Sequence, residues 1–218
     1  DETELINLCE KHFGQLKAGA KTVRGLDFKP QQLTEKIVTL SPEKYNRSIY
    51  SVARVLPPLD MKTGVYWRIF AAMLSRGMTS PLFKAIREDR GLAYNIGVHR
   101  RTYTDVALFG ISVSTQFKNM DEIDTIVWDV LPKVLEDEAR FNEMKHSITQ
   151  SATYAEFTVG GLVDDAVNDV ADYGRVVTLD EYLTLLNDMT HADLKSYIKP
   201  LIQKDDYLTI RVDCDRKE

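Results

Sequence analysis

The fold of this chain is decided by the sequence Ser80-Pro-Leu-Phe-Lys-Ala-Ile-Arg-Glu-Asp-Arg-Gly-Leu-Ala-Tyr94. Its first residues specify the start of a helix. The Ser80 hydroxyl can accept a hydrogen bond from an unpaired backbone N–H, and Pro81 suits the first helical position because no N–H is needed there. Gly91 can adopt the left-handed conformation that ends many helices. The stretch therefore predicts a short helix with both ends defined.

A strand is predicted directly after this helix. Large residues recur at every second position after the glycine, at Leu92, Tyr94, Ile96 and Val98. This period of two predicts a strand over residues 92–103. Within the helix, Phe83, Ile86 and Arg87 lie at positions i, i+3 and i+4, so an arginine stands at the edge of an apolar face. Arg87 and Tyr94 thus flank one helix-to-strand turn and can both present polar groups to a molecule beside it.

Further strands and one buried helix are predicted around this turn. Residues 36–40 and 48–56 have strand patterns, whereas residues 64–74 are apolar on nearly every side, as in a buried helix. Residues 106–117 form the second strand of a hairpin, with Thr104-Asp105 as its turn. One face of that second strand carries apolar residues that can pack: Ala107, Phe109, Ile111 and Val113.

The second half of the chain is predicted to be mostly helical. Asn119 and Glu122 resemble a capping box. They precede a helix with a continuous apolar stripe, formed by Ile123, Ile126, Val127, Val130, Leu131 and Val134. Residues 136–157 are charged and predict a long, largely exposed helix. Gly160-Gly161 predicts a break before another helix over residues 162–173.

Two more helices and a strand are predicted to close the chain. Thr178 or Asp180 can cap the first helix, and Thr190 with Asp193 can cap the second. Residues 207–212 form the final strand. Hairpin strands combined with blocks of helices predict an α+β fold, a two-layer sandwich in which helices pack on one face of an antiparallel-rich sheet.

The composition argues against several classes of partner. The chain has 218 residues and a formal net charge of -5, so it can bury a core and has no basic excess for binding nucleic acid. No apolar run approaches the ~20 residues that a membrane span needs. Cys9 and Cys214 lie near opposite ends of the chain. Two isolated cysteines are more often free and partly buried, although their spacing leaves a disulfide between them open.

The sequence lacks the residues of a zinc peptidase site. A His-x-x-Glu-His motif sets two histidines four residues apart on one helical face, with a glutamate that reaches a metal-bound water. None of the four histidines lies three to five residues from another, and they are His12, His99, His146 and His191. The acidic residues at helical spacing are explained by an exposed helix face: Asp164, Asp165 and Asp169. We therefore predict no metal site and no catalytic residue in this chain alone.

The run from Ser80 to Tyr94, preceded by Leu74-Ser-Arg-Gly-Met-Thr79, resembles the signature of one family. It is similar to the metal-free half of pitrilysin/insulinase-type zinc peptidases, the inverzincins, whose form is a small-residue turn, Ser-x-Leu-Phe and then Arg-Glu-x-Arg-Gly-Leu-Ala-Tyr. The resemblance spans most of residues 36–214 and implies the same two-layer fold. It also implies that residues 1–25 are the tail helix of a preceding half with a linker, and that residues 26–218 form the metal-free domain.

The resemblance implies a substrate-binding role for Arg87 and Tyr94. In related peptidases the matching arginine and tyrosine reach across to the substrate at the zinc of the other half and bind a carbonyl near the scissile bond. A guanidinium and a phenol are donors suited to a developing oxyanion. The resemblance further implies that zinc and the His-x-x-Glu-His motif belong to a partner half or subunit, that the substrate is an extended or unfolded peptide, and that this chain alone is inactive.

Three alternatives stay open at this point. Arg87 can pair with a neighbouring acid such as Glu88 or Asp89, while Tyr94 packs with its hydroxyl in water. The chain can also be a non-proteolytic assembly subunit, like the core subunits of a respiratory complex that share this fold. Finally, it can be a module that captures extended peptides by strand addition.

Overall fold

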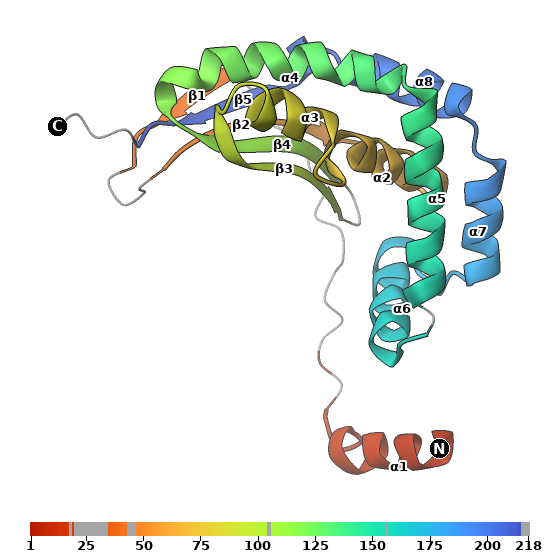
Figure 1. Ribbon diagram of the computed structural model, residues 1–218. Helices are drawn as coiled ribbons and strands as arrows, with labels where there is room; N and C mark the ends of the chain where they lie inside the picture. Colours follow the sequence, from red (N-terminus) through yellow and green to blue (C-terminus); the bar gives the residue numbers. More distant parts are fainter. Residues whose placement is uncertain (18, 20–34, 43–46, 104–105, 156, 215–218) are drawn as a thin grey trace.

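The computed structural model describes residues 1–17, 19, 35–42, 47–103, 106–155 and 157–214. Its centre is a five-stranded sheet in the order β1-β5-β2-β4-β3 (Figure 1). The strands are β1 (Ile37–Leu40), β2 (Ser48–Leu56), β3 (Ala93–Thr102), β4 (Ala107–Thr115) and β5 (Leu208–Val212). β1 and β5 are parallel, and the other neighbouring pairs are antiparallel. The predicted strands are confirmed, whereas the turn predicted at Thr104-Asp105 lies outside the described residues.

Helices cover one face of the sheet, which confirms the predicted α+β fold (Figure 1). The helices that lie over this face are α2 (Met61–Ser75) and α4 (Met120–Leu135), and α8 (His191–Ile198) packs against α2. Three further helices lie beyond the end of the sheet: α5 (Glu138–Ala155), α6 (Val159–Tyr173) and α7 (Leu179–Asp188). Short helical turns complete the chain: α3 (Pro81–Phe83), η1 (Lys84–Glu88), η2 (Phe117–Asn119), η3 (Lys199–Leu201) and η4 (Lys204–Asp206).

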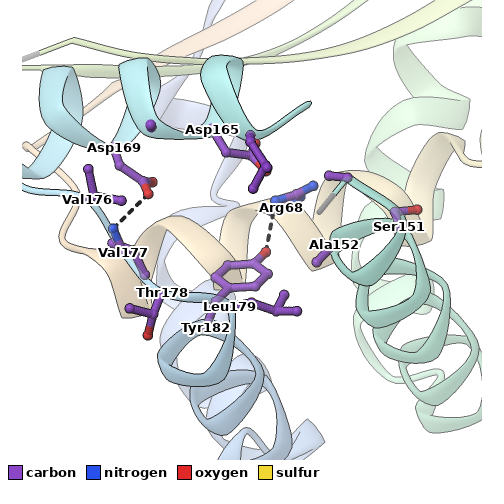
Figure 2. Close-up of a pocket in the computed structure, with 13 residues that line it drawn as sticks. Arg68, Ser151, Ala152, Asp165, Asp169, Val176, Val177, Thr178, Leu179 and Tyr182 are labelled. Carbon is purple, nitrogen blue, oxygen red and sulfur yellow. Dashed lines mark hydrogen bonds between the residues drawn. The ribbon is translucent and has the colours of Figure 1, made fainter. Parts of the chain in front are cut away.

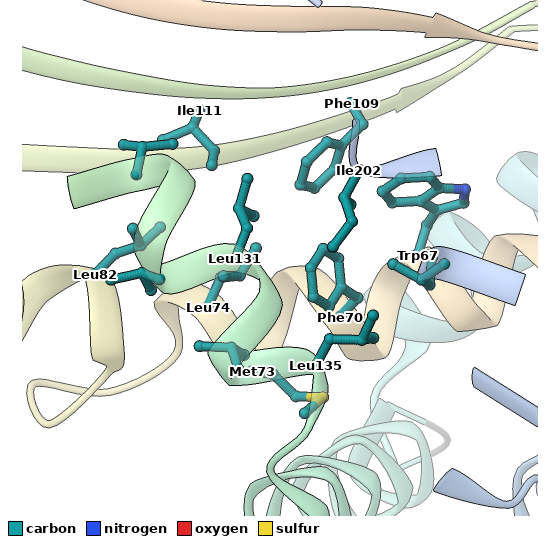
Figure 3. Packing of buried hydrophobic residues seen from close by; sticks show 14 of the residues in the cluster. Trp67, Phe70, Met73, Leu74, Leu82, Phe109, Ile111, Leu131, Leu135 and Ile202 are labelled. Carbon is teal, nitrogen blue, oxygen red and sulfur yellow. The ribbon is translucent and has the colours of Figure 1, made fainter. Parts of the chain in front are cut away.

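The hydrophobic core lies between α2, α4 and the sheet (Figure 3). Trp67 and Phe70 of α2 pack on Phe109 of β4, with ring centroids 4.6 and 6.0 Å from that of Phe109. All three side chains are fully buried, as expected for the aromatic centre of a core. The predicted inward face of β4 is confirmed, and the predicted apolar stripe of α4 is buried along its whole length.

The break predicted at Gly160-Gly161 lies earlier in the structure, between the end of α5 at Ala155 and the start of α6 at Val159. Both glycines lie in the first turn of this helix, which begins at Val159. The Thr158 hydroxyl accepts a hydrogen bond from the backbone N–H of Gly161 at 3.1 Å. This cap offsets the low helix propensity of glycine, so the helix starts three residues earlier than the predicted residue 162.

The capping box predicted at the start of α4 is also wrong. Asn119 occupies the N-cap position, but its side chain makes no capping hydrogen bond. Its amide nitrogen instead lies 3.5 Å from the Leu92 carbonyl oxygen and from the Thr115 hydroxyl. The Glu122 carboxylate lies 3.5 Å from Nε of Arg90. Residues distant along the chain therefore occupy both side chains that the local pattern assigned to a cap.

The caps of α7 and α8 agree with the sequence. The Thr178 hydroxyl accepts a hydrogen bond from the N–H of Glu181 at 3.2 Å. Thr190 and Asp193 form a complete capping box, in which each side chain accepts a hydrogen bond from the backbone N–H of the other residue. A short-range pattern was sufficient here because donor and acceptor lie three residues apart.

The first helix, α1 (Glu2–Phe13), lies apart from the sheet and the other helices (Figure 1). None of its side chains is buried. The predicted boundary between residues 25 and 26 lies outside the described residues, so it stays a prediction.

Cys9 and Cys214 are both free, and Cys9 is exposed while Cys214 is half-buried. Among the described helices, none is both long and apolar enough to cross a membrane.

Candidate functional site

The segment that carries Arg87 is more irregular than the helix that the sequence predicts. It begins as one α-helical turn with Pro81 at its first position and then widens into the π-helix Lys84–Glu88. The N–H of Asp89 donates to the Lys84 carbonyl oxygen at 2.9 Å, five residues back. Single π-helical turns are frequent at functional sites, where they re-aim side chains.

The two ends of this segment differ in how well they match the prediction. Gly91 ends it as predicted, with φ of 63° and a hydrogen bond from its N–H to the Arg87 carbonyl oxygen at 2.9 Å. Ser80 occupies the N-cap position, yet its buried hydroxyl makes no capping bond and has no hydrogen-bond partner among the described residues. The Ser80 carbonyl oxygen accepts from the Lys84 N–H at 2.9 Å instead, so the backbone rather than the side chain closes the first turn.

Tyr94 is the extra residue of a β-bulge at the start of β3. Ala93 pairs with Thr115 of β4, and the next pair joins Asn95 to Ser114, so Tyr94 has no partner across the ladder. The predicted alternation that placed Tyr94 on one face with Ile96 is therefore wrong at this point, because a bulge shifts all following residues to the opposite face. Tyr94 is 72% exposed as a result.

The structure brings Arg87 and Tyr94 together. The Arg87 guanidinium lies 4.3 Å from the ring centroid of Tyr94 and 4.8 Å from that of Phe83, so it is held between two aromatic rings. Its Nη1 also donates to the Tyr94 carbonyl oxygen at 3.4 Å. Cation–π contacts of this kind fix the position of a guanidinium while its N–H donors stay available.

The alternative pairing of Arg87 with Glu88 or Asp89 is not what the structure shows. Within the described part of the chain, no carboxylate lies within 4.0 Å of the Arg87 guanidinium, whereas Arg90 has the ion pair with Glu122. Among the residues with a described position, the positive charge of Arg87 therefore has no salt-bridge partner.

Arg87 and Tyr94 line an open groove of about 950 Å³. Other residues at the same end of the sheet complete it: Arg47, Ser48, Gly91, Leu92, Ala93, Ser114, Thr115, Gln116 and Asn119. Thr115 donates to the Leu92 carbonyl oxygen at 2.7 Å and so fixes the turn between Arg87 and Tyr94. The groove carries two arginines and several neutral donors, a surface suited to carbonyl oxygens or other negative groups.

The sequence interpretation missed Arg47 and Thr115 as residues of this groove. They lie 68 residues apart in the chain, at the start of β2 and the end of β4. The register that pairs Ser48 with Thr115, and Thr115 with Ala93, places all three strand ends together. The sequence predicts the hairpin of residues 92–103 and 106–117, which is the one signal that could have placed Thr115 beside Tyr94. It does not predict the pairing of β2 with β4, which brings Arg47 to the groove.

Two of the histidines and one of the helical aspartates make hydrogen bonds within the domain. His99 lies on β3 with Nε2 2.6 Å from the Ser112 hydroxyl, and His191 has Nε2 2.9 Å from the Leu135 carbonyl oxygen. Among the described residues, no group of three or more histidine, cysteine or acidic side chains is arranged to hold a metal ion. The exposed-face interpretation of the aspartates needs a correction at Asp169, which accepts a hydrogen bond from the Val177 N–H at 2.9 Å.

The fold and this groove define an α+β domain with a cationic, aromatic surface beside an irregular helix-to-strand turn. Residues 1–148 match the family described as the peptidase M16 inactive domain. The chain therefore belongs to this family, which confirms the resemblance to the metal-free half of pitrilysin/insulinase-type zinc peptidases.

Curated relatives point in the same direction. An uncharacterized zinc protease of Rickettsia felis is 22% identical over 198 residues, which are 89% of this chain and 47% of that protein. The uncharacterized zinc protease YmxG of Bacillus subtilis is 24% identical over 209 residues, 92% of this chain and 49% of that protein. The chain thus spans about half the length of the curated relatives it matches.

Solved structures show the same fold. A protease from Helicobacter pylori matches with a TM-score of 0.80 at 15% identity, covering 98% of this chain and 52% of that one. A peptidase M16 inactive domain from Pseudomonas fluorescens matches with a TM-score of 0.77 at 15% identity, covering 100% and 52%. A chain of Complex III2 from Candida albicans matches with a TM-score of 0.74 at 14% identity, covering 98% and 52%.

Proposed function

We propose that this chain is the metal-free half of a zinc metalloendopeptidase and that Arg87 and Tyr94 bind the peptide substrate at the zinc site of a partner half. The observation that carries the proposal is the Arg87 guanidinium, which stands between the rings of Phe83 and Tyr94 with no carboxylate within 4.0 Å in the described residues. Keeping an unpaired cation in a fixed position at an open groove is useful when a ligand supplies the negative group.

The arrangement suits stabilisation of a developing oxyanion. Arg87 offers several N–H donors in one plane, and the exposed Tyr94 adds an O–H donor close to it. Because the aromatic rings already restrict the guanidinium, little side-chain entropy is lost when it meets a carbonyl oxygen. Zinc, held by a His-x-x-Glu-His motif of the partner half, would supply an activated water there. The substrate is an extended or unfolded peptide, and this chain alone is inactive.

The test is peptidase activity with zinc, measured on this chain combined with its partner half. We expect Arg87→Ala and Tyr94→Phe each to lower kcat/KM by about ten-fold or more, which corresponds to ~1.4 kcal/mol of lost transition-state stabilisation. Matched controls are Lys84→Ala, an exposed cation in the same π-helix, and Tyr103→Phe, an exposed tyrosine that follows β3. Both controls are expected to stay within about two-fold of wild type.

A second candidate function is a non-proteolytic assembly subunit, which is favoured by the structural match to a chain of Complex III2. This function predicts that the substitutions at Arg87 and Tyr94 leave assembly unchanged and that no partner confers peptidase activity. Unchanged kcat/KM in both variants, with an intact fold, would replace the peptidase proposal with this one.

Strand addition of a peptide to the free edge of β3 in the absence of any partner would favour the binding-module alternative.

A further inference from the structure

A cavity formed by α2, α5, α6 and α7 shares no lining residue with the groove at Arg87 (Figure 2). It has an apolar part and a polar part that meet at common residues: Arg68, Asp165, Asp169, Val177 and Tyr182. Arg68 lies at the junction, where its Nη1 donates to the Tyr182 hydroxyl at 2.9 Å (Figure 2). The two parts together form one site that is more apolar at one end and more polar at the other.

The apolar part has a volume of about 180 Å³. Small or aliphatic side chains form one side of it: Ala152, Ala155, Leu162, Ala166, Val176 and Leu179. Polar and aromatic side chains complete its lining: Arg68, Ser151, Asp165, Asp169, Thr178 and Tyr182. A cavity of about 150 Å³ with apolar walls is large enough to admit benzene. This part of the cavity therefore has room for one apolar side chain of a ligand.

The polar part, of about 490 Å³, is lined by two arginines, Arg68 and Arg100. Arg100 of β3 donates to the Thr102 hydroxyl at 3.4 Å, and Arg68 bonds Tyr182. No carboxylate in the described part of the chain lies within 4.0 Å of either guanidinium. Two like charges facing one cavity repel each other, and an anion between them relieves that repulsion.

The facing wall, on α6, carries Asp165, Asp169 and Asp172. Asp169 is engaged by the Val177 N–H. Burial raises the pKa of Asp172, and the charge of Asp169 raises it further while Arg100 opposes the rise. Three aspartates against two arginines disfavour a simple anion in this space. A ligand with a carboxylate at one end and an N–H group beside it matches both walls.

We propose that this cavity binds the α-carboxylate and side chain of an apolar amino-acid residue, presented either by a free amino acid or by the carboxyl end of a peptide. The carboxylate lies between Arg68 and Arg100, the N–H or ammonium group faces Asp165 and Asp172, and the side chain enters the apolar part. This binding goes beyond the proposed function, because it requires neither the partner half nor the groove at Arg87.

The first test is calorimetric titration of this chain with N-acetyl-leucine, N-acetyl-leucinamide, N-acetyl-glycine and leucine. We expect N-acetyl-leucine to bind at least about ten-fold more tightly than its amide, which lacks the carboxylate, and than N-acetyl-glycine, which lacks the side chain. Tighter binding of leucine identifies the free amino acid as the ligand. Tighter binding of N-acetyl-leucine identifies the carboxyl end of a peptide.

Variants of the two walls test the same assignment. Arg100→Gln is expected to weaken N-acetyl-leucine binding by about ten-fold, whereas Lys62→Gln removes a cation of α2 that does not line the cavity and leaves it unchanged. Ala166→Leu fills the apolar part and weakens N-acetyl-leucine more than N-acetyl-glycine. Equal binding of acid and amide, unchanged affinity in a folded Arg100→Gln variant, or no saturable binding by N-acetyl-leucine or leucine at about 10 mM overturns the proposal.

Discussion

Substitution of Arg140 by methionine is expected to destabilise the domain, because Arg140 holds the C-terminal end of α2. Arg140 of α5 is only 9% exposed. Its Nε donates to the Met73 carbonyl oxygen at 3.3 Å, and its Nη2 donates to the Arg76 carbonyl oxygen. Both carbonyls belong to the C-terminal end of α2, where a helix leaves its last carbonyls unpaired and favours a cation.

The magnitude follows from those two bonds. A hydrogen bond to a charged group contributes roughly 1.5–3 kcal/mol, and a buried carbonyl left without a donor costs about 1–3 kcal/mol. The third contact, from Nη1 to Glu143 at 2.7 Å, adds little because the Glu143 side chain is 61% exposed. Since water can reach part of the vacated site in Arg140→Met, we expect a loss of about 2–4 kcal/mol in the free energy of unfolding.

Urea unfolding, followed by far-UV circular dichroism, measures this loss. The matched control is Lys133→Met, which removes an exposed i,i+4 pair with Asp129 at 2.6 Å and should cost less than about 0.5 kcal/mol. If Arg140→Met stays within about 0.5 kcal/mol of wild type with an unchanged denaturant slope, the two hydrogen bonds to α2 do not stabilise the domain as expected.

Two further predictions concern single local features. Gly91→Ala places a Cβ in open space at φ of 63°, so its expected cost of ~1 kcal/mol in the free energy of unfolding comes from the left-handed backbone alone. The control is Gly160→Ala, in a helical turn with equal room, which should be neutral or stabilising in thermal unfolding. Equal effects of the two substitutions would contradict this expectation. Hydrogen bonds from the Thr63 hydroxyl and N–H lower the pKa of Asp60. The contribution of Asp60 to stability is therefore present above the unfolded pKa of about 3.9 and lost as the pH falls through the lower folded pKa. Asp60→Asn should flatten the dependence of the unfolding free energy on pH below about pH 4. An unaltered dependence in urea titrations would argue against this role of Asp60.

Elements with strong periodicity were predictable from the sequence. The strand at residues 48–56 was predicted with the bounds that the structure has, because the alternation of its own residues marks its two faces and Pro57-Pro58 marks its end. The apolar stripe of α4 fixed which face of that helix is buried, and the Thr190 cap fixed where α8 begins. These signals lie within a few residues of the structure they specify.

Features that depend on distant residues were not predictable. The bulge at Tyr94 arises from the pairing of β3 with β4, and no local pattern marks it. Asn119 is predicted as a cap, but its side chain instead lies near the carbonyl oxygen of Leu92, which precedes β3. Arg68 and Arg100 meet at one cavity only because α2 and β3 pack together. Local propensity cannot report such contacts, since tertiary partners compete with it.

We propose that Arg87 and Tyr94 act together on one group of the substrate. A double-mutant cycle on kcat/KM, with Arg87→Ala, Tyr94→Phe and both together in the zinc-loaded assembly of the two halves, tests it most directly. We expect the double variant to lose less activity than the product of the single losses, with a coupling energy of about 0.5–3 kcal/mol. Strictly multiplicative losses, or full activity in all three folded variants, would contradict it.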